Sequence, residues 1–242
     1  MQVGLFITCL SDVFFPEVGI SMVRVLRRLG VDVGFPEAQT CCGQPAFNSG
    51  YREDAKKAAR QMIRAFEDDE AVITPSGSCA AMIRHYYPKL FAGEEEWEER
   101  ARSLADRCTE FSEFVAAHQG TTPIRARLEG TATYHHSCHM YRGLGLVEPP
   151  LALLSQVEGL SLKELPFHDD CCGFGGTFAV KMAGISTAMA DEKIGHIEET
   201  GADYLVGSDM SCLMHLGGRI RREGKPVEIL HVAQVLDRGW IE

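Results

Sequence analysis

Short apolar runs and longer amphipathic segments follow one another along the chain. Residues 3–7 form an apolar run that is too short for a helix and predicts a strand. Residues 16–29 carry apolar side chains at helical spacing, begin with proline and end before Gly30. The same criteria predict further strands at residues 31–35, 71–74, 131–134, 160–165, 204–206 and 227–230. They predict helices at residues 53–66, 151–157, 185–200 and 232–236, a helix that ends at 219–225, and a helical connector at 94–118.

The predicted elements occur in the same order twice. Strands that alternate with helices are typical of a parallel sheet covered by helices on both faces. We therefore predict an α/β protein of two similar halves, each a small parallel sheet flanked by helices, related by approximate pseudo-two-fold symmetry. Residues 1–120 form the first repeat together with the helical connector, and residues 121–242 form the second.

Composition limits the class of protein. The chain has 242 residues, and its net charge of −10 argues against nucleic acid or an anionic membrane surface as the main partner. No apolar stretch of the sequence approaches the roughly 18 residues that a membrane helix needs, and the first residues lack the features of a secretory signal. We therefore expect a cytoplasmic protein. Thiols stay reduced in that compartment, so the nine cysteines indicate metal or redox chemistry.

Eight of the nine cysteines follow one pattern, which occurs twice. Nine cysteines placed at random would give roughly 0.3 adjacent pairs, so two pairs, each followed by glycine, indicate a repeated structural unit. Cys108 alone stands outside the pattern, and we interpret it as a buried structural thiol. The first copy consists of Cys9, Cys41-Cys42-Gly43 and Cys79, and the second of Cys138, Cys171-Cys172-Gly173 and Cys212.

Each cysteine position lies just after a predicted strand. Ligands of parallel sheets bind beyond the carboxyl ends of the strands, so each half is expected to gather four thiols at one rim. Four thiols fit zinc or an iron–sulfur cluster, but the tight knuckles of structural zinc sites and the common ferredoxin spacings are both missing from the sequence. Adjacent thiolates can bind different irons of one cluster, and Gly43 and Gly173 permit the sharp turn that this requires. The pattern therefore favours an iron–sulfur cluster, with zinc and thiol redox chemistry as alternatives.

Five further residues near the second copy are candidates for the site. His135 and His139 could donate hydrogen bonds to sulfur or carry a proton, although an ordinary polar strand end is the alternative. Arg142 could clamp a carboxylate, or could be a surface arginine. Gly175 and Gly176 could present backbone amides to cluster sulfides or to an anion. Their spacing does not match a dinucleotide-binding fingerprint.

Several long strings carry a specific family resemblance. They include Cys41-Cys42-Gly43-Gln44-Pro45-Ala46-Phe47, Pro75-Ser76-Gly77-Ser78-Cys79 and Cys171-Cys172-Gly173-Phe174-Gly175-Gly176-Thr177. With these strings the chain resembles, over essentially its whole length, the lactate utilization protein A family. That family belongs to the cysteine-rich CCG-domain iron–sulfur oxidoreductases, as do the cysteine-rich subunits of heterodisulfide reductase and of anaerobic glycerol-3-phosphate dehydrogenase.

The resemblance implies a function. It implies an electron-transfer component that helps to oxidise L-lactate, a small 2-hydroxy acid, to pyruvate with two further lactate-utilization proteins, one of which carries ferredoxin-like clusters. One or two [4Fe–4S] clusters per chain would be held by the eight cysteines of the pattern. The heterodisulfide reductase relatives use five thiols per motif, whereas Met82 and His215 stand here at the fifth positions. Two alternatives stay open: the same scaffold serving glycolate, glycerol 3-phosphate or a thiol-disulfide, and a zinc-stabilised interaction module without a redox role.

Overall fold

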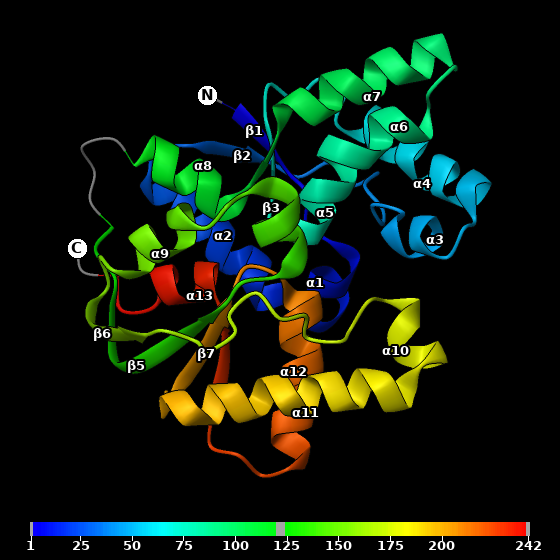
Figure 1. The fold of residues 1–242 in the computed structure, drawn as a ribbon. Helices are drawn as coiled ribbons and strands as arrows, with labels where there is room; N and C mark the ends of the chain where they lie inside the picture. Colours follow the sequence, from blue (N-terminus) through cyan, green and yellow to red (C-terminus); the bar gives the residue numbers. More distant parts are fainter. Residues whose placement is uncertain (1, 120–123, 241–242) are drawn as a thin grey trace.

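The fold consists of two four-stranded parallel sheets flanked by helices (Figure 1). It was obtained as a computed structural model that describes residues 2–119 and 124–240. The strand order is β2-β1-β3-β4 in the first sheet and β6-β5-β7-β8 in the second. The strands are β1 (Gln2–Leu5), β2 (Asp32–Gly34), β3 (Val72–Thr74), β4 (Cys108–Glu110), β5 (Arg127–His135), β6 (Glu158–Lys163), β7 (Tyr204–Gly207) and β8 (Glu228–His231).

The helices connect the strands and cover the sheets. Two π-helical segments, η1 (Met82–Tyr86) and η2 (His139–Leu144), begin just after a cysteine of the repeated pattern. In the first half the α-helices are α1 (Cys9–Phe14), α2 (Pro16–Arg28), α3 (Gln44–Asn48), α4 (Arg52–Ala65), α5 (Gly77–Ala81), α6 (Tyr87–Leu90), α7 (Glu95–Arg107) and α8 (Phe111–His118). In the second half they are α9 (Glu148–Leu154), α10 (Thr177–Lys181), α11 (Ala183–Thr200), α12 (Met210–Arg222) and α13 (Val232–Asp237).

The two halves have the same strand register, which confirms the predicted α/β fold of two similar halves. Leu5 of β1 pairs with Ile73 of β3, and the residues at the same distances from the cysteines of the second copy, Tyr134 and Val206, pair in the same way. The halves meet at an isolated antiparallel bridge between Ser76 and Asp209. Each of these two residues lies three positions before the last cysteine of its own copy. A residue that pairs with its own equivalent lies next to the axis of a two-fold arrangement.

The predicted helical connector at 94–118 is wrong in its middle. It consists of α7, the short strand β4 and α8, and β4 completes the first sheet beside β3. Three residues between two helices are too few to show a period of two, so the hydrophobic pattern does not reveal this strand. Cys108, the first residue of β4, is buried as predicted, and burial raises the pKa of its thiol to about 12. The predicted boundary between residues 120 and 121 lies outside the described residues.

The halves share an apolar core. The largest cluster of buried side chains contains Val3 and Leu5 of the first half together with Leu230 and Val232 of the second. Helix α2 packs against α13, as Figure 1 shows near the centre of the molecule. Asp237 at the end of α13 accepts hydrogen bonds from side chains of α2. The two halves are therefore held against each other over a broad contact, which sets the geometry of whatever lies between their rims.

Glu110 at the end of β4 is a buried carboxyl group whose ionisation opposes folding. It caps α8 by accepting hydrogen bonds from the backbone N–H groups of Ser112 and Glu113, at 2.8 and 3.3 Å. Burial raises its pKa to about 8, whereas a glutamate in the unfolded chain has a pKa of about 4.3. Glu110 therefore makes its full contribution to the free energy of unfolding below the pKa that it has in the unfolded chain. This contribution is lost as the pH rises towards the folded pKa of about 8.

We predict that Glu110→Gln removes a pH-dependent loss of stability. Between pH 5 and 8 the free energy of unfolding of the wild type should fall relative to that of the variant, by on the order of 1.4 kcal/mol per pH unit at most. Anaerobic urea unfolding at pH 5, 6.5 and 8 measures the difference. Glu113→Gln is the control, because Glu113 forms a partly exposed ion pair with Arg84. Parallel pH profiles for Glu110→Gln and the wild type would contradict the prediction.

Candidate metal centre

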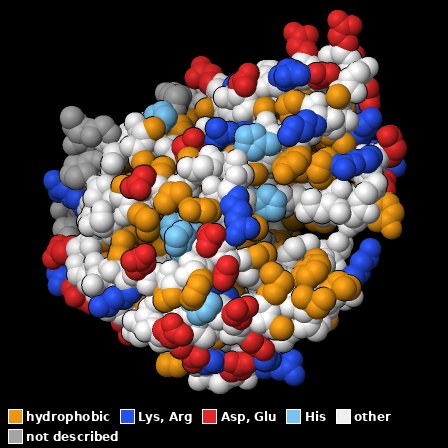
Figure 2. Space-filling view, viewed as in Figure 1, with side chains coloured by type: hydrophobic (Ala, Val, Ile, Leu, Met, Phe, Trp, Pro, Cys, Tyr) orange, Lys and Arg blue, Asp and Glu red, His pale blue; other side chains and the backbone are white. Residues whose placement is uncertain are grey.

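All eight cysteines of the repeated pattern line one cavity between the two halves. The cavity has a volume of about 340 Å³, and Figure 2 shows the surface hollowed between the two lobes of the molecule. The sequence predicts a rim of thiols in each half, and the packing of the halves turns the two rims towards each other. All nine cysteines are free thiols. We call Cys9, Cys41, Cys42 and Cys79 the first quartet, and Cys138, Cys171, Cys172 and Cys212 the second quartet.

The thiols of the first quartet hydrogen-bond one another in chain order. Cys9 begins α1, Cys41 and Cys42 precede α3, and Cys79 lies in α5. The sulfur atoms of Cys42 and Cys79 are 3.3 Å apart. Hydrogen bonds from Cys42, and then from Cys9, lower the pKa of Cys41 to about 3, while those of Cys9 and Cys42 are raised. These hydrogen bonds therefore favour the thiolate form of Cys41, the form that binds metals.

The second quartet repeats this arrangement. Cys138 precedes η2, Cys171 and Cys172 lie in the loop before α10, and Cys212 lies in the first turn of α12. Hydrogen bonds from Cys138, and then from Cys172, lower the pKa of Cys171 to about 2. The pKa values of Cys138 and Cys172 are raised, as in the first quartet. Both quartets thus bring four soft ligands together, and in each the hydrogen bonds favour the thiolate form of one cysteine, Cys41 or Cys171.

The glycine of each Cys-Cys-Gly motif makes the turn on which this geometry depends. Gly43 and Gly173 have φ angles of 82° and 86°, in the left-handed region that favours glycine. Their N–H groups donate to the sulfur atoms of Cys41 and Cys171, each over 3.4 Å. A Cβ atom on Gly173 would lie 2.6 Å from the carbonyl oxygen of Ser186, too close for any side chain.

We predict that Gly173→Ala is more harmful than Gly43→Ala. The new methyl group meets backbone at 2.6 Å at position 173 but at 3.2 Å at position 43, and both positions need a positive φ. We expect Gly173→Ala to lower the free energy of unfolding by about 1–3 kcal/mol. Anaerobic urea unfolding measures this loss. Gly218→Ala in α12 is the matched control, since its methyl group meets no atom within 4 Å and should slightly stabilise the helix.

Of the other predicted candidates, three line the cavity. Gly175 and Gly176, with φ angles of 53° and 64°, lie at its edge before α10. The ring of His139 lies beside Cys138, with Nδ1 3.8 Å from the sulfur. Arg142 lies outside the cavity lining, and its guanidinium donates to the backbone oxygen and the carboxylate of Asp169. The fold therefore does not bring Arg142 to the thiols.

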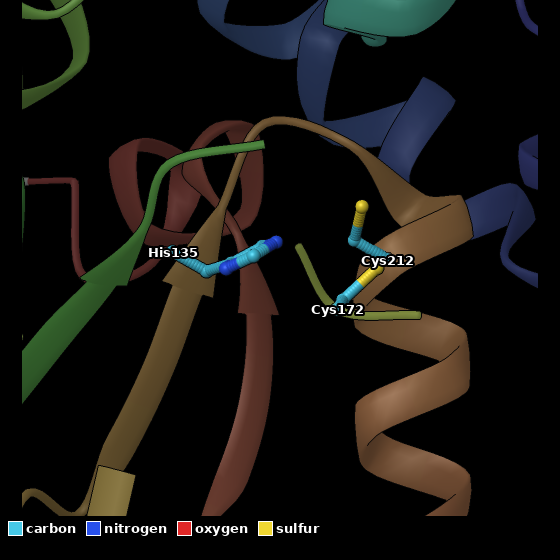
Figure 3. A group of neighbouring side chains, drawn as sticks. All are labelled: His135, Cys172 and Cys212. Atoms are coloured by element: carbon cyan, nitrogen blue, oxygen red, sulfur yellow. The ribbon is translucent and has the colours of Figure 1, made fainter. Parts of the chain in front are cut away.

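His135 lies behind the second quartet. Its ring points from the end of β5 towards Cys172 and Cys212 (Figure 3). One ring nitrogen and the sulfur atoms of the two cysteines all lie within 4.8 Å of one another. The side chain is 1% exposed, and neither ring nitrogen has a hydrogen-bond partner among the described residues. Burial lowers its pKa to about 3, so the imidazole is neutral at physiological pH. A buried polar group without a partner in the protein is rare and indicates a missing partner.

Sequence reasoning missed Asp209, a buried carboxylate that lines the same cavity. It caps α12 by accepting hydrogen bonds from Ser211, and it also accepts from the backbone N–H of Ser78 at 2.9 Å and from the hydroxyl of Ser76 at 3.2 Å. The only sequence signal is its place as a helix-capping residue three positions before Cys212. Its contact with the other half follows from the tertiary structure alone.

The class of protein follows from the fold and the repeated thiols. Residues 3–84 and 132–217 match the family of the cysteine-rich CCG domain, so the chain contains two such domains. It is 60% identical over 239 residues to lactate utilization protein A 1 of Bacillus anthracis (strain CDC 684 / NRRL 3495), with 99% of each chain covered. It is 54% identical over 237 residues to lactate utilization protein A of Geobacillus sp. (strain WCH70), covering 98% of this chain and 99% of that one. The chain belongs to the lactate utilization protein A family.

Similarity to solved structures is low. Glutamate racemase RacE1 from Bacillus anthracis aligns over 98% of this chain and 78% of its own, with 11% identity and a TM-score of 0.36. A similarity of this size carries no inference about function.

Proposed function

We propose that this protein is an iron–sulfur electron-transfer component of a multi-protein system that oxidises L-lactate to pyruvate. The observation that carries the proposal is the pair of thiol quartets around one cavity. The names of the relatives, which refer to lactate utilization, supply the substrate class, a small 2-hydroxy acid. Cys9, Cys41, Cys42 and Cys79 would hold one [4Fe–4S] cluster, and Cys138, Cys171, Cys172 and Cys212 a second.

Each full quartet is too widely spread for a single zinc ion, although two sulfurs of the first quartet, those of Cys42 and Cys79, are in contact at 3.3 Å. Four thiolates on one tetrahedral zinc ion, each about 2.3 Å from it, lie about 3.8 Å apart. Within the described residues, the one group of three such ligands with all atoms inside 4.8 Å is His135, Cys172 and Cys212. Neither full quartet is packed that tightly, and a multi-iron cluster spans a wider set of sulfurs.

When bound, such a cluster accepts and releases single electrons. The protein supplies the remaining functions of the site. The N–H groups of Gly43 and Gly173 hold one cysteine sulfur of each quartet, and the buried walls of the cavity exclude water from the inner thiols. Oxidation of L-lactate to pyruvate releases two electrons and two protons. His139 lines the cavity and is the side chain that we propose to accept a proton there, whereas His135 is too deeply buried to exchange one with solvent.

The proposal includes partners and a compartment. Two further lactate-utilization proteins, one with ferredoxin-like clusters, would deliver and remove electrons, and the cytoplasm would keep the thiols reduced. Within the described residues, no helix has the length and apolar character needed to cross a membrane. We further propose that residues 1–120 and 121–242 act as two repeats with one cluster each.

The second candidate is a zinc-stabilised module, which the compact group of His135, Cys172 and Cys212 favours. Anaerobic purification followed by iron, sulfide and zinc analysis separates the two functions. We expect about four iron and four sulfide ions per cluster. Stoichiometric zinc without sulfide would overturn the redox proposal. The visible absorbance of the clusters should then bleach on addition of L-lactate in the presence of both partners. Bleaching by glycolate, glycerol 3-phosphate or a dithiol instead would assign the same scaffold to another donor.

A further inference from the structure

The two quartets are equivalent, but the side chains behind them are not. Phe6 lies three residues before the first cysteine of its copy, and His135 occupies the same position in the second copy. Three residues after the last cysteine, Met82 corresponds in the same way to His215. The strand registers of the two sheets agree with this correspondence. Each of these two positions thus has an apolar side chain in the first half and an imidazole in the second.

Two positions on the helix behind the Cys-Cys-Gly turn show the same contrast. A Cβ atom placed on the glycine of each turn would lie nearest to the backbone oxygen of Ala55 in α4 or of Ser186 in α11, which makes these two residues equivalent. Seven residues further along lie Met62 and Lys193. Both reach the loop before the cysteine pair. The sulfur of Met62 accepts from a backbone N–H at 3.2 Å, and Nζ of Lys193 donates to the backbone oxygen of Phe167 at 2.6 Å.

The rear wall of the first quartet is therefore apolar except for Tyr87, whose buried hydroxyl donates to the backbone oxygen of Cys42 at 2.8 Å. Phe6, Ala55, Met62 and Met82 are fully buried, and they pack in one apolar cluster with Cys42 and Cys79. No charged group and no hydrogen-bond donor reaches the sulfurs from these four side chains.

The second quartet has a polar and basic rear wall. Ser186 donates to the backbone oxygen of Gly173 at 2.8 Å and lies 3.2 Å from Nε2 of His215. The side chain of Lys193 is buried below the same loop. His135 faces Cys172 and Cys212, and neither of its ring nitrogens has a hydrogen-bond partner within residues 2–119 and 124–240. Three carboxylates act against this wall: Asp169 and Asp170, which attract Lys193 from just before Cys171, and Asp209, which lines the cavity. Donors from both halves bind the carboxylate of Asp209, so its charge is shared across the boundary.

We propose that the two cluster sites differ in reduction potential, that the second quartet holds the cluster of higher potential, and that His135 is the N–H donor to it. This inference rests on the proposed function. Hydrogen bonds to sulfur and nearby positive charge stabilise the reduced form of a cluster, whereas an apolar wall does not. Four cysteines already complete the ligand set of a four-iron cluster, which leaves His135 the role of a donor. Electrons that enter the chain therefore collect at the second half.

An anaerobic redox titration followed by electron paramagnetic resonance tests the proposal. The variants are His135→Phe, which copies the first half, His135→Asn, which keeps an N–H donor, and Lys193→Met. In the wild type we expect two midpoint potentials. His135→Phe should lower the higher one by at least about 59 mV, a tenfold change in the equilibrium constant of a one-electron couple, and leave the other unchanged. His135→Asn should restore most of the loss, and Lys193→Met should lower the same potential.

Iron and sulfide analysis of the wild type comes first, because a chain without clusters would overturn the proposed function itself. If clusters are present, a single shared midpoint would overturn the inference alone, as would a His135→Phe variant that shifts neither potential or both equally. A Cys42→Ser/Cys79→Ser background, which lacks two ligands of the first quartet, assigns the shifted potential to the second half. If His135→Phe fails to retain its second cluster, Lys193→Met decides the outcome by the same criterion.

Discussion

Serine in place of Cys172 and Cys212 should remove about half of the iron and sulfide that the chain binds. A hydroxyl is a much poorer ligand than a thiolate for iron–sulfur clusters, and these two buried cysteines are half of the second quartet. The first quartet draws on other loops and helices, so its cluster should stay. The equivalent double variant of the first quartet, Cys42→Ser with Cys79→Ser, should remove the other half of the iron and sulfide. Colorimetric iron and sulfide analysis after anaerobic purification measures both results.

Cys108→Ser is the control for these variants. Cys108 is at least as deeply buried as the four thiols that these variants replace, but it lies in β4, away from the cavity lining. Its variant should keep the full iron and sulfide content. Because all eight thiols line one cavity, a different result is informative. Loss of all iron from either double variant would show one centre shared by both quartets and would contradict two separate clusters.

Alanine in place of Asp209 should lower the free energy of unfolding by about 3–5 kcal/mol. The carboxylate accepts from the backbone N–H groups of Ser78 and Ser211 and from the hydroxyls of Ser76 and Ser211. All of these donors lie at the boundary between the halves. Truncation leaves buried donors without an acceptor, and removing a partner of a buried charge-assisted hydrogen bond is expensive.

Two variants separate the causes. Ser76→Ala removes one donor to the carboxylate and also the cap of α5, because the Ser76 hydroxyl accepts from the N–H of Cys79, and it should cost about 1–2 kcal/mol. Asp209→Asn keeps an acceptor of the same shape without the charge and should fall between Ser76→Ala and Asp209→Ala. Anaerobic urea unfolding of the three variants measures the series. Equal stability of Asp209→Ala and the wild type would show that this carboxylate does not hold the halves together.

The repeated cysteine pattern could be read from the sequence because it combines rare residues at fixed spacings. Most strands and long helices were also predictable, since their apolar faces follow periods of two or 3.6 residues. β4 was not, because its residues Cys-Thr-Glu form no apolar run and lie directly between two helices, unlike the equally short β2 and β3. Two donors to Asp209, the hydroxyl of Ser76 and the backbone N–H of Ser78, lie 133 and 131 residues from it in sequence, and no local pattern specifies such a contact.

Local patterns in the sequence predict two copies of one α/β unit, each with four thiols behind strand ends and with a glycine at each cysteine pair. These features are local, because spacing and backbone preference decide them. The packing of the two halves brings both sets of thiols to a single cavity and leaves Arg142 outside it. The tertiary structure also places His135 and Lys193 behind the second quartet and apolar side chains behind the first. The physical reason is that these arrangements depend on the packing of helices and strands from opposite ends of the chain.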